Sequence, residues 1–196
     1  RLNGLAKMPG VRLFGNLVLS FASKMSSGYW KIFDPTNGFT AIHQKVAQEL
    51  ALDKISNDYF FESDMLFQLN IARAVVADVP IQAIYGEETS SLKISRILFL
   101  FVGKHLANFF RRIAYSYFLR DFSIASIELI IGLIFVTFGV IFGCLEWYNS
   151  TVTGTTATAG TVIIAALPLL VGSQLLISFL NFDVNNQPNQ PLHPNL

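Results

Sequence analysis

"ASIELIIGLIFVTFGVIFGCL", residues 125–145, is the stretch that decides how this chain of 196 residues folds. It is apolar along almost its whole length, and its only charged residue, Glu128, lies in its first turn. A second such stretch, "AGTVIIAALPLLVGSQLLISFL", occupies residues 159–180 and has no charge. As a helix, each is long enough to cross roughly 30 Å of hydrocarbon. The sequence therefore predicts two transmembrane helices within residues 121–182, rather than buried helices of a soluble domain.

Composition and charge agree with a membrane protein. The chain is 52% hydrophobic and only 14% charged. All 14 Lys and Arg lie in residues 1–120 with 9 of the 13 acids, whereas residues 121–196 hold 4 acids and no basic residue. This bias is a signal of membrane topology and not of nucleic-acid binding. The positive-inside rule predicts that residues 1–120 and the polar tail 183–196 are cytoplasmic, and that the loop "EWYNSTVTGTTAT" is on the opposite side.

Residues 91–120, "SLKISRILFLFVGKHLANFFRRIAYSYFLR", contain six basic residues and no acid. Polar residues recur along this stretch at intervals of four or eight: Arg96, Lys104, Asn108, Arg112, Ser116 and Arg120. Such a stripe on an apolar helix is typical of amphipathic helices in the membrane interface, where anionic headgroups or a lipid phosphate would face it. Gly103 is the point at which two helices would meet. An ordinary amphipathic core helix is the alternative.

Residues 1–90 have the pattern of a soluble α/β piece. Helical apolar spacing appears in "GVRLFGNLVLSFASKM", a short extended stretch leads into a helix in "FTAIHQKVAQEL", and "FFESDMLFQLNIARAVVA" predicts a helix. "DVPIQAIY" has the imperfect alternation of a strand. The predicted fold class is therefore α/β for residues 1–90, followed by juxtamembrane amphipathic helices and a two-helix transmembrane hairpin.

A polar turn, Asp34-Pro35-Thr36-Asn37-Gly38, interrupts this first region. Proline fixes φ, asparagine tolerates left-handed geometry, and glycine adopts positive φ readily, so the stretch taken alone predicts a surface turn. Its neighbours along the chain are an acidic helix start, a predicted strand and a Ser-rich turn. The sequence of segments, rather than any one of them, therefore suggests a functional region.

The order of these segments resembles the C-terminal half of family 2 glycosyltransferases with a GT-A fold. The nearest resemblance is to the branch that acts on polyprenyl phosphates and includes dolichol-phosphate mannosyltransferase. The motifs that carry it are "DPTNGFTAI", "FFESDMLFQL", "DVPIQAIYGEETSSLKI" and the two C-terminal apolar stretches. Together they cover most of residues 1–182. Tyr85 departs from the pattern, because relatives often have an arginine before Gly-Glu.

The resemblance implies roles for particular residues. Asp34 would be the catalytic acid, facing the site between donor sugar and acceptor phosphate. The residues implied in substrate binding are Arg1, Arg12, Asn16, Asn37, Gly38, Glu62, Asp64, Ser90, Ser91 and Lys93. Arg1, Arg12 and Asn16 would contact phosphates of donor or acceptor, and Ser90, Ser91 and Lys93 would lie beside the lipid phosphate. No metal ligand is expected in this chain.

The nucleotide-binding half of such enzymes ends in an Asp-x-Asp motif that holds Mg²⁺ or Mn²⁺ on the diphosphate. Here the only such spacing is Glu62-x-Asp64, in the wrong place by the family's order. We therefore expect the chain to be the C-terminal part of a longer enzyme, inactive alone, with the metal bound mainly by the absent half.

The function implied is transfer of a hexose from a nucleotide sugar to a polyprenyl phosphate, in the biosynthesis of cell-envelope glycans. The partners would be that donor, that acceptor and membrane lipids, but no nucleic acid, and a homo-oligomer stays open. The expected location is a membrane with the catalytic part cytoplasmic, the bacterial inner membrane being favoured over the endoplasmic reticulum. The alternative is a non-catalytic two-span membrane protein with a cytoplasmic adaptor domain.

Overall fold

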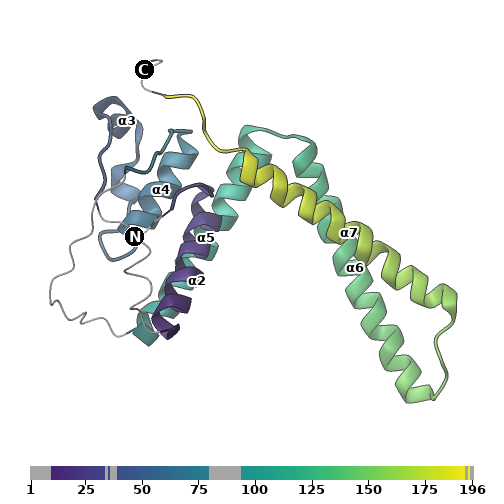
Figure 1. Cartoon of the computed structure of the whole chain (residues 1–196). Coiled ribbons are helices and arrows are strands. Elements are labelled where there is room, and N and C mark those ends of the chain that lie inside the picture. The colour runs from purple at the N-terminus through teal and green to yellow at the C-terminus, as the bar shows by residue number, and fades with distance from the viewer. Residues whose placement is uncertain (1–9, 34, 36–38, 80–93, 193, 195–196) are drawn as a thin grey trace. The chain divides into compact units, whose positions relative to one another are not determined.

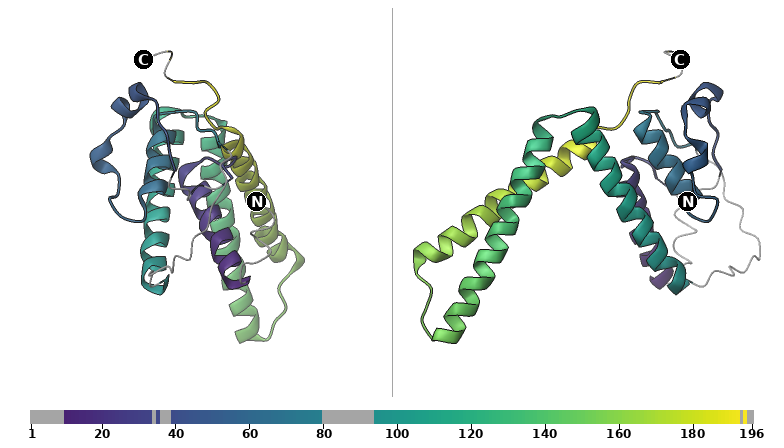
Figure 2. Two further views of the ribbon diagram at one scale, coloured as in Figure 1. Left: turned by 60° about the vertical axis from the view of Figure 1, so that its left-hand side comes forward. Right: turned by 180° about the vertical axis from the view of Figure 1, so that it is seen from behind.

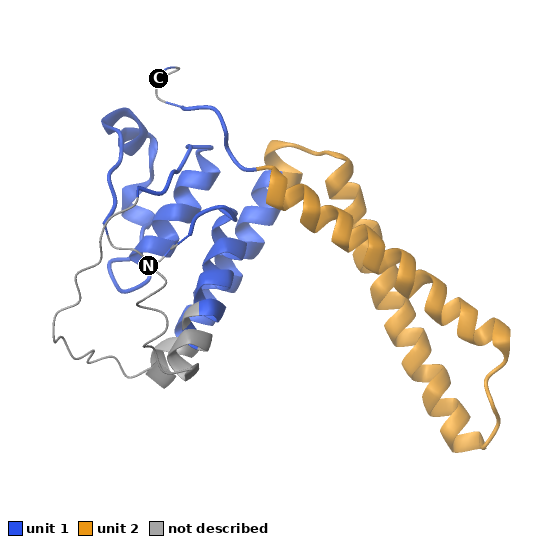
Figure 3. Cartoon of the chain, viewed as in Figure 1, with its two compact units in different colours: residues 1–116, 187–196 blue, residues 117–186 orange. Residues whose placement is uncertain are grey.

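The computed structural model describes residues 10–33, 35, 39–79, 94–192 and 194, and these residues form helices and irregular segments (Figure 1). The chain divides into two compact units, coloured separately in Figure 3. The first unit comprises residues 1–116 and 187–196, and the second comprises residues 117–186. We describe each unit by itself.

The prediction of an α/β fold is wrong, because the described residues contain no strand. Most of the predicted strand, residues 80–85, lies outside the described residues. Its first two residues, Asp78 and Val79, and the predicted extended stretch 39–43 are irregular. A strand needs a neighbour for its backbone groups, and here Asp78 instead accepts a hydrogen bond through its side chain, from the backbone N–H of Phe33 at 2.6 Å.

Helices α2 (Gly10–Ser27), α4 (Phe61–Ile71) and α5 (Ile94–Ala114) pack against one another in the first unit. The views of Figures 1 and 2 agree that α2 and α5 run side by side. The predicted helices 10–25 and 60–77 are thus confirmed as α2 and α4, although α4 ends early, before Arg73 at φ 61°. Helix α5 continues through Gly103, so the predicted break there is wrong.

The helices meet through polar side chains, an arrangement that reverses the usual one. α2 buries Ser23, Ser26 and Ser27, whereas its apolar residues Leu17 and Phe21 are exposed. α5 likewise turns a polar side inward, made of His105, Asn108, Arg112 and, at its C-terminal end, Ser116. The predicted polar stripe of α5 therefore packs against protein over much of its length. The small size of serine lets the helix backbones approach closely, and hydrogen bonds replace lost water.

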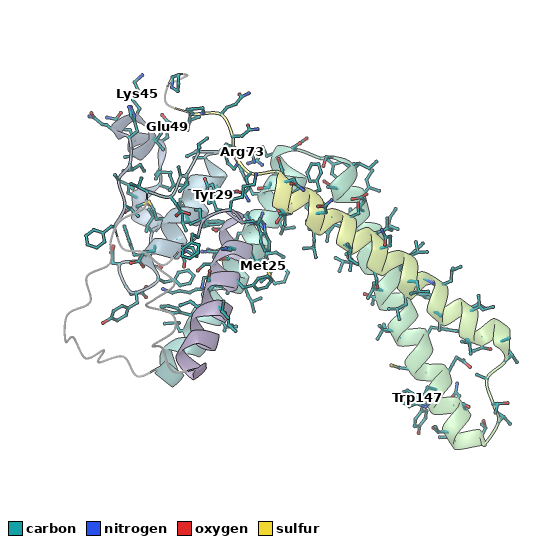
Figure 4. All side chains as sticks on the ribbon, viewed as in Figure 1. Met25, Tyr29, Lys45, Glu49, Arg73 and Trp147 are labelled. Atoms are coloured by element: carbon teal, nitrogen blue, oxygen red, sulfur yellow. The ribbon has the colours of Figure 1, made fainter. Side chains whose placement is uncertain are left out.

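A small apolar core lies beside this polar interior. It consists of Tyr29, Ile32 and Leu66, with Leu69 and Val76 packed against it. The Tyr29 hydroxyl donates to the Ala74 carbonyl, and burial raises the pKa of Tyr29. Figure 4 labels Tyr29 and Arg73 in this region. The helix predicted in the later part of residues 39–50 is confirmed as α3 (Gln44–Glu49), with the 3-10 turn η1 (Leu52–Lys54) after it.

The second unit is a helical hairpin of α6 (Ile124–Thr153) and α7 (Ala159–Asn185), preceded by the π-helix η2 (Tyr115–Arg120), which begins in the first unit. α6 and α7 are both long and apolar enough to cross a membrane. Their axes approach closely because glycines lie at the contact (Figure 2). A Cβ on Gly139 would be 2.9 Å from the Ala165 carbonyl oxygen, and one on Gly172 would be 2.8 Å from the backbone nitrogen of Val136.

Polar contacts close the hairpin at the end where α6 begins and α7 finishes. Ser178 donates to the Glu128 carboxylate at 2.9 Å, and the Tyr117 hydroxyl donates to the buried Asp183 at 2.6 Å. At the start of α6, the Ser123 N–H donates to Ser126 Oγ at 3.1 Å. Glu128 and Asp183 therefore each accept a hydrogen bond from a donor within the hairpin, which lowers the cost of placing a carboxylate near an apolar stretch.

The opposite end of the hairpin differs from the sequence prediction. α6 was expected to end near residue 145, but it continues through "EWYNSTVT" to Thr153 and includes Trp147 (Figure 4). Hydroxyls keep the polar turns helical: Thr151 donates to the Tyr148 carbonyl and Thr153 to that of Asn149, both at 2.7 Å. Gly154, at φ 68°, then ends the helix, so the loop is reduced to residues 154–158.

Candidate functional site

A groove of about 510 Å³ lies along one side of α4 in the first unit. Its walls are mostly apolar and include Ile32, Leu66 and Leu69 from the core. Three titratable side chains also line it: His43, Glu62 and Asp78. A groove of this volume, with few polar groups on apolar walls, is of the kind that holds a small ligand.

The groove brings one predicted site residue to the polar turn. Glu62 lines it together with Pro35, which belongs to that turn, and with Phe39 and Thr40, which follow it. Glu62 is half-buried in the first turn of α4, and within the described part of the chain its carboxylate has no hydrogen-bond partner. Asp78 and His43, by contrast, are engaged: Asp78 accepts from the Phe33 N–H, and His43 Nδ1 accepts from the Lys45 N–H at 3.3 Å.

Most of the other predicted site residues lie outside the part of the chain that the structure describes. Asp34, Asn37, Gly38, Arg1, Ser90, Ser91 and Lys93 lie outside the described residues. Arg12 and Asn16 belong to α2, but the described features do not include their side chains. The roles implied for these residues stay predictions.

Asp64 faces the opposite way from Glu62, toward α5. One carboxylate oxygen accepts hydrogen bonds from the Ser56 N–H at 3.0 Å and from the Ser56 hydroxyl, and the other accepts from Asn108 Nδ2 at 2.6 Å. Three donors satisfy most of the acceptor capacity of a carboxylate. In this structure Asp64 therefore joins the segment before α4 to α5.

Lys104 extends the same network. Its ammonium donates to the Ser56 hydroxyl at 3.1 Å and to Asp58 at 2.7 Å, and lies 5.2 Å from the centre of the Phe60 ring. The hydrogen bond from Lys104 is the main cause that holds the pKa of Asp58 below its usual value. The acceptors of this predicted interface lysine are therefore protein groups rather than lipid phosphates. Arg111 is exposed.

Further along α5, His105 and Arg112 are buried. Ser26 Oγ lies 2.8 Å from His105 Nδ1, and burial lowers the pKa of His105 to about 4, so the ring is neutral at pH 7. Arg112 donates to the Met25 carbonyl at 2.9 Å. Sequence reasoning missed His105 and Ser26. The only available signal was the four-residue spacing of polar residues along α5. That spacing is the same whether the polar side of the helix is buried or faces solvent, so it could not identify a buried histidine.

The described residues include no group of three His, Cys, Asp or Glu side chains that could hold a metal ion. Binding of Mg²⁺ or Mn²⁺ mainly by another part of the enzyme stays a prediction. Comparison with known proteins adds no assignment, because no protein-family model, curated protein or solved structure matches the chain. The resemblance to glycosyltransferases thus rests on the motifs themselves.

Proposed function

We propose that this chain is part of a membrane-bound glycosyltransferase that moves a hexose from a nucleotide sugar to a polyprenyl phosphate. The observation that carries the proposal is the groove at the polar turn, where Glu62 stands beside Pro35 and Phe39. Two independent motifs, "DPTNGFTAI" and "FFESDMLFQL", thus contribute to one concave surface. Because no strand occurs in the described residues, the proposal rests on these residues and not on a fold.

The chemistry asks little of a general base. A lipid phosphate is already ionised, so transfer depends on positioning and on neutralising the charge of the leaving diphosphate. Glu62 is an anion and would repel both phosphates unless a cation lay between them. Its suitable partners are the hydroxyl groups of the sugar, which donate hydrogen bonds to a carboxylate. We therefore assign Glu62 to binding the hexose.

Membrane attachment supports a lipid acceptor. The two candidate spans of the second unit would keep the groove-bearing unit near a bilayer, where a polyprenyl phosphate resides. The charge bias of the sequence would place that unit on the cytoplasmic side, where nucleotide sugars are available to a bacterial inner-membrane enzyme.

The second candidate is a non-catalytic two-span protein with a helical adaptor domain. It is favoured by the polar interior of the first unit, in which Asp64, Lys104 and His105 are all occupied by internal contacts. Such side chains stabilise the unit through contacts within it, as expected of a structural domain. The two candidates differ in whether the groove binds a sugar donor.

The test is hexose transfer in membranes that contain the full natural protein. Labelled nucleotide hexoses are supplied with polyprenyl phosphate, and extraction into organic solvent measures the product. Glu62→Gln should lower transfer by about 10²-fold, the scale expected for one positioned polar contact. The control is Asp53→Asn, on the exposed turn η1, which should retain activity. Absence of transfer with every nucleotide hexose, or equal activity of the two variants, would favour the adaptor.

A further inference from the structure

The first unit exposes apolar side chains on two neighbouring helices. On α2, Leu17 is 61% exposed and Phe21 is 58% exposed, and on α5 the corresponding values are 54% for Leu100 and 64% for Phe110. Val18 and Leu106 are exposed as well. These six residues are called the outer faces of α2 and α5 below. Several exposed apolar side chains on two helices that pack together favour an interaction site over ordinary solvated surface.

The sides of these helices opposite the outer faces are polar and buried. Ser26 bonds to His105, Arg112 bonds to the Met25 carbonyl, and Ser23 lies 3.1 Å from the Ser63 hydroxyl. Water-soluble helices have the reverse pattern, with apolar residues inside. Small polar residues at helix contacts and apolar residues outside are instead the rule for helices surrounded by lipid. This pattern favours lipid, rather than water, as the medium that contacts the outer faces.

Two further observations point to a bilayer. α5 ends at Ala114 and the candidate span α6 begins at Ile124, so nine residues of chain join α5 to an apolar helix that could cross a membrane. α2 and α5 also contain no acid, so no carboxylate on these two helices would repel anionic headgroups. Arg111, exposed next to Phe110, is placed to meet anionic headgroups.

We propose that the outer faces of α2 and α5 insert into the membrane interface, so that the first unit lies on the bilayer through apolar contact. The basic stripe of α5 is then chiefly a packing surface, and attachment depends on Leu, Val and Phe side chains instead of on charge. This inference goes beyond the proposed glycosyl transfer and does not depend on it. It predicts that high salt, which screens headgroup attraction, leaves the insertion unchanged.

The test uses nitroxide labels in the full chain, reconstituted in vesicles of mixed anionic and neutral lipid. Cysteine replaces Leu17 or Leu106 in a Cys144→Ser background, and collisions with oxygen and with a water-soluble nickel chelate are compared. Both labels should favour oxygen several-fold more than a label at Asn57, an exposed residue of the first unit outside these helices. A label at Ile134 of α6, 58% exposed, is the matched lipid control. All these ratios should be the same at high salt.

Three results would overturn the proposal. Labels at positions 17 and 106 that collide with the nickel chelate as often as the Asn57 label would show that water covers these faces. Spin–spin broadening that grows with protein density would show a second copy there, and protection from both reagents would show another protein segment. Because labels on exposed residues leave the packed interior intact, each result reports on the surface and not on folding.

Discussion

At the residue scale, the interior of the first unit contains buried polar side chains that hydrogen-bond across the helices. Gly28 is the tightest point, because a Cβ there would lie 2.9 Å from both Arg112 Nη1 and Asn70 Nδ2. Its φ of 79° also lies in the left-handed region, where glycine ends α2 without strain. One small residue thus permits both the end of the helix and the burial of Arg112.

Gly28→Ala should destabilise the protein by roughly 1–3 kcal/mol, since it adds both backbone strain and a steric clash. The measurement is thermal unfolding of the full chain in detergent, followed by circular dichroism. Gly15→Ala, within α2 and with open space around the glycine, is the matched control and should be neutral or stabilising by up to about 1 kcal/mol. Equal effects of the two substitutions would contradict the packing described for Arg112.

The buried His105 predicts a pH dependence. Its pKa of about 4 lies below the ordinary 6.5, because burial disfavours the charged ring. The unfolded chain therefore binds more protons than the folded chain between pH 6.5 and pH 4. The contribution of His105 to stability is complete above pH 6.5, falls on acidification through that window, and levels off below it.

Unfolding measured between pH 7 and pH 4 tests this titration. His105→Gln carries no titrating ring, so its stability should fall less steeply with acid than that of the natural chain. Parallel curves for the two proteins would mean that His105 is accessible to protons in the folded state.

Sequence reasoning at this scale identified residue types better than their surroundings. Lys104, Asn108 and Arg112 were recognised as one stripe, but the stripe was assigned to lipid, whereas Lys104 and Arg112 bond to protein. Periodicity shows which residues share a side of a helix, not what covers that side. Glu62 and Asp64 show that the surroundings of a side chain do not follow from its residue type. They are two positions apart on α4, yet Glu62 lines the groove and Asp64 bonds to Asn108 at the interface with α5.

At the element scale, the two long helices were predictable, whereas Asp78 and Val79, the described start of the predicted strand, are irregular. Sustained apolar runs located α6 and α7 because spanning a membrane constrains many consecutive residues. The polar end of α6 was missed, since hydroxyl-to-carbonyl bonds such as that from Thr153 to Asn149 maintain helix where composition suggests a loop. The short alternation in residues 78–85 was weak evidence for a strand, because pairing partners are nonlocal.

The hairpin predicts a sharp difference between two glycines of α6. A Cβ on Gly139 would meet the Ala165 carbonyl oxygen at 2.9 Å, whereas one on Gly143 would meet only Ala165 Cβ at 3.6 Å, an ordinary contact. Gly139→Ala should weaken the association of α6 with α7 by about 1–3 kcal/mol, because backbone must move to relieve the overlap. Gly143→Ala, four residues away, should change it little.

Steric-trap unfolding in bicelles, with labels on α6 and α7, measures this difference. Indistinguishable free energies for the two alanine variants would contradict the close approach of the helices at Gly139.

At the scale of the whole molecule, the account depends on α6 and α7 crossing a bilayer. The proposed binding of a sugar in the groove and the proposed insertion of the outer faces both require that the protein is attached to a membrane. The change from charged to apolar sequence near residue 120, visible in composition, lies close to residue 117, where the second unit begins. The helical architecture of the first unit was not foreseen, since its packing runs through serines and a histidine that no apolar pattern reveals.

The most direct test is the side of the membrane on which each end of the hairpin lies. Single cysteines at Thr153 and at Asn57, both exposed, are made in a Cys144→Ser background and treated in intact cells with an impermeant thiol reagent. The account predicts that the cysteine at position 153 reacts from outside, and that the one at position 57 reacts only after the membrane is opened. Labelling of both positions in intact cells, or of position 57 alone, would contradict a hairpin that crosses the membrane with the first unit inside.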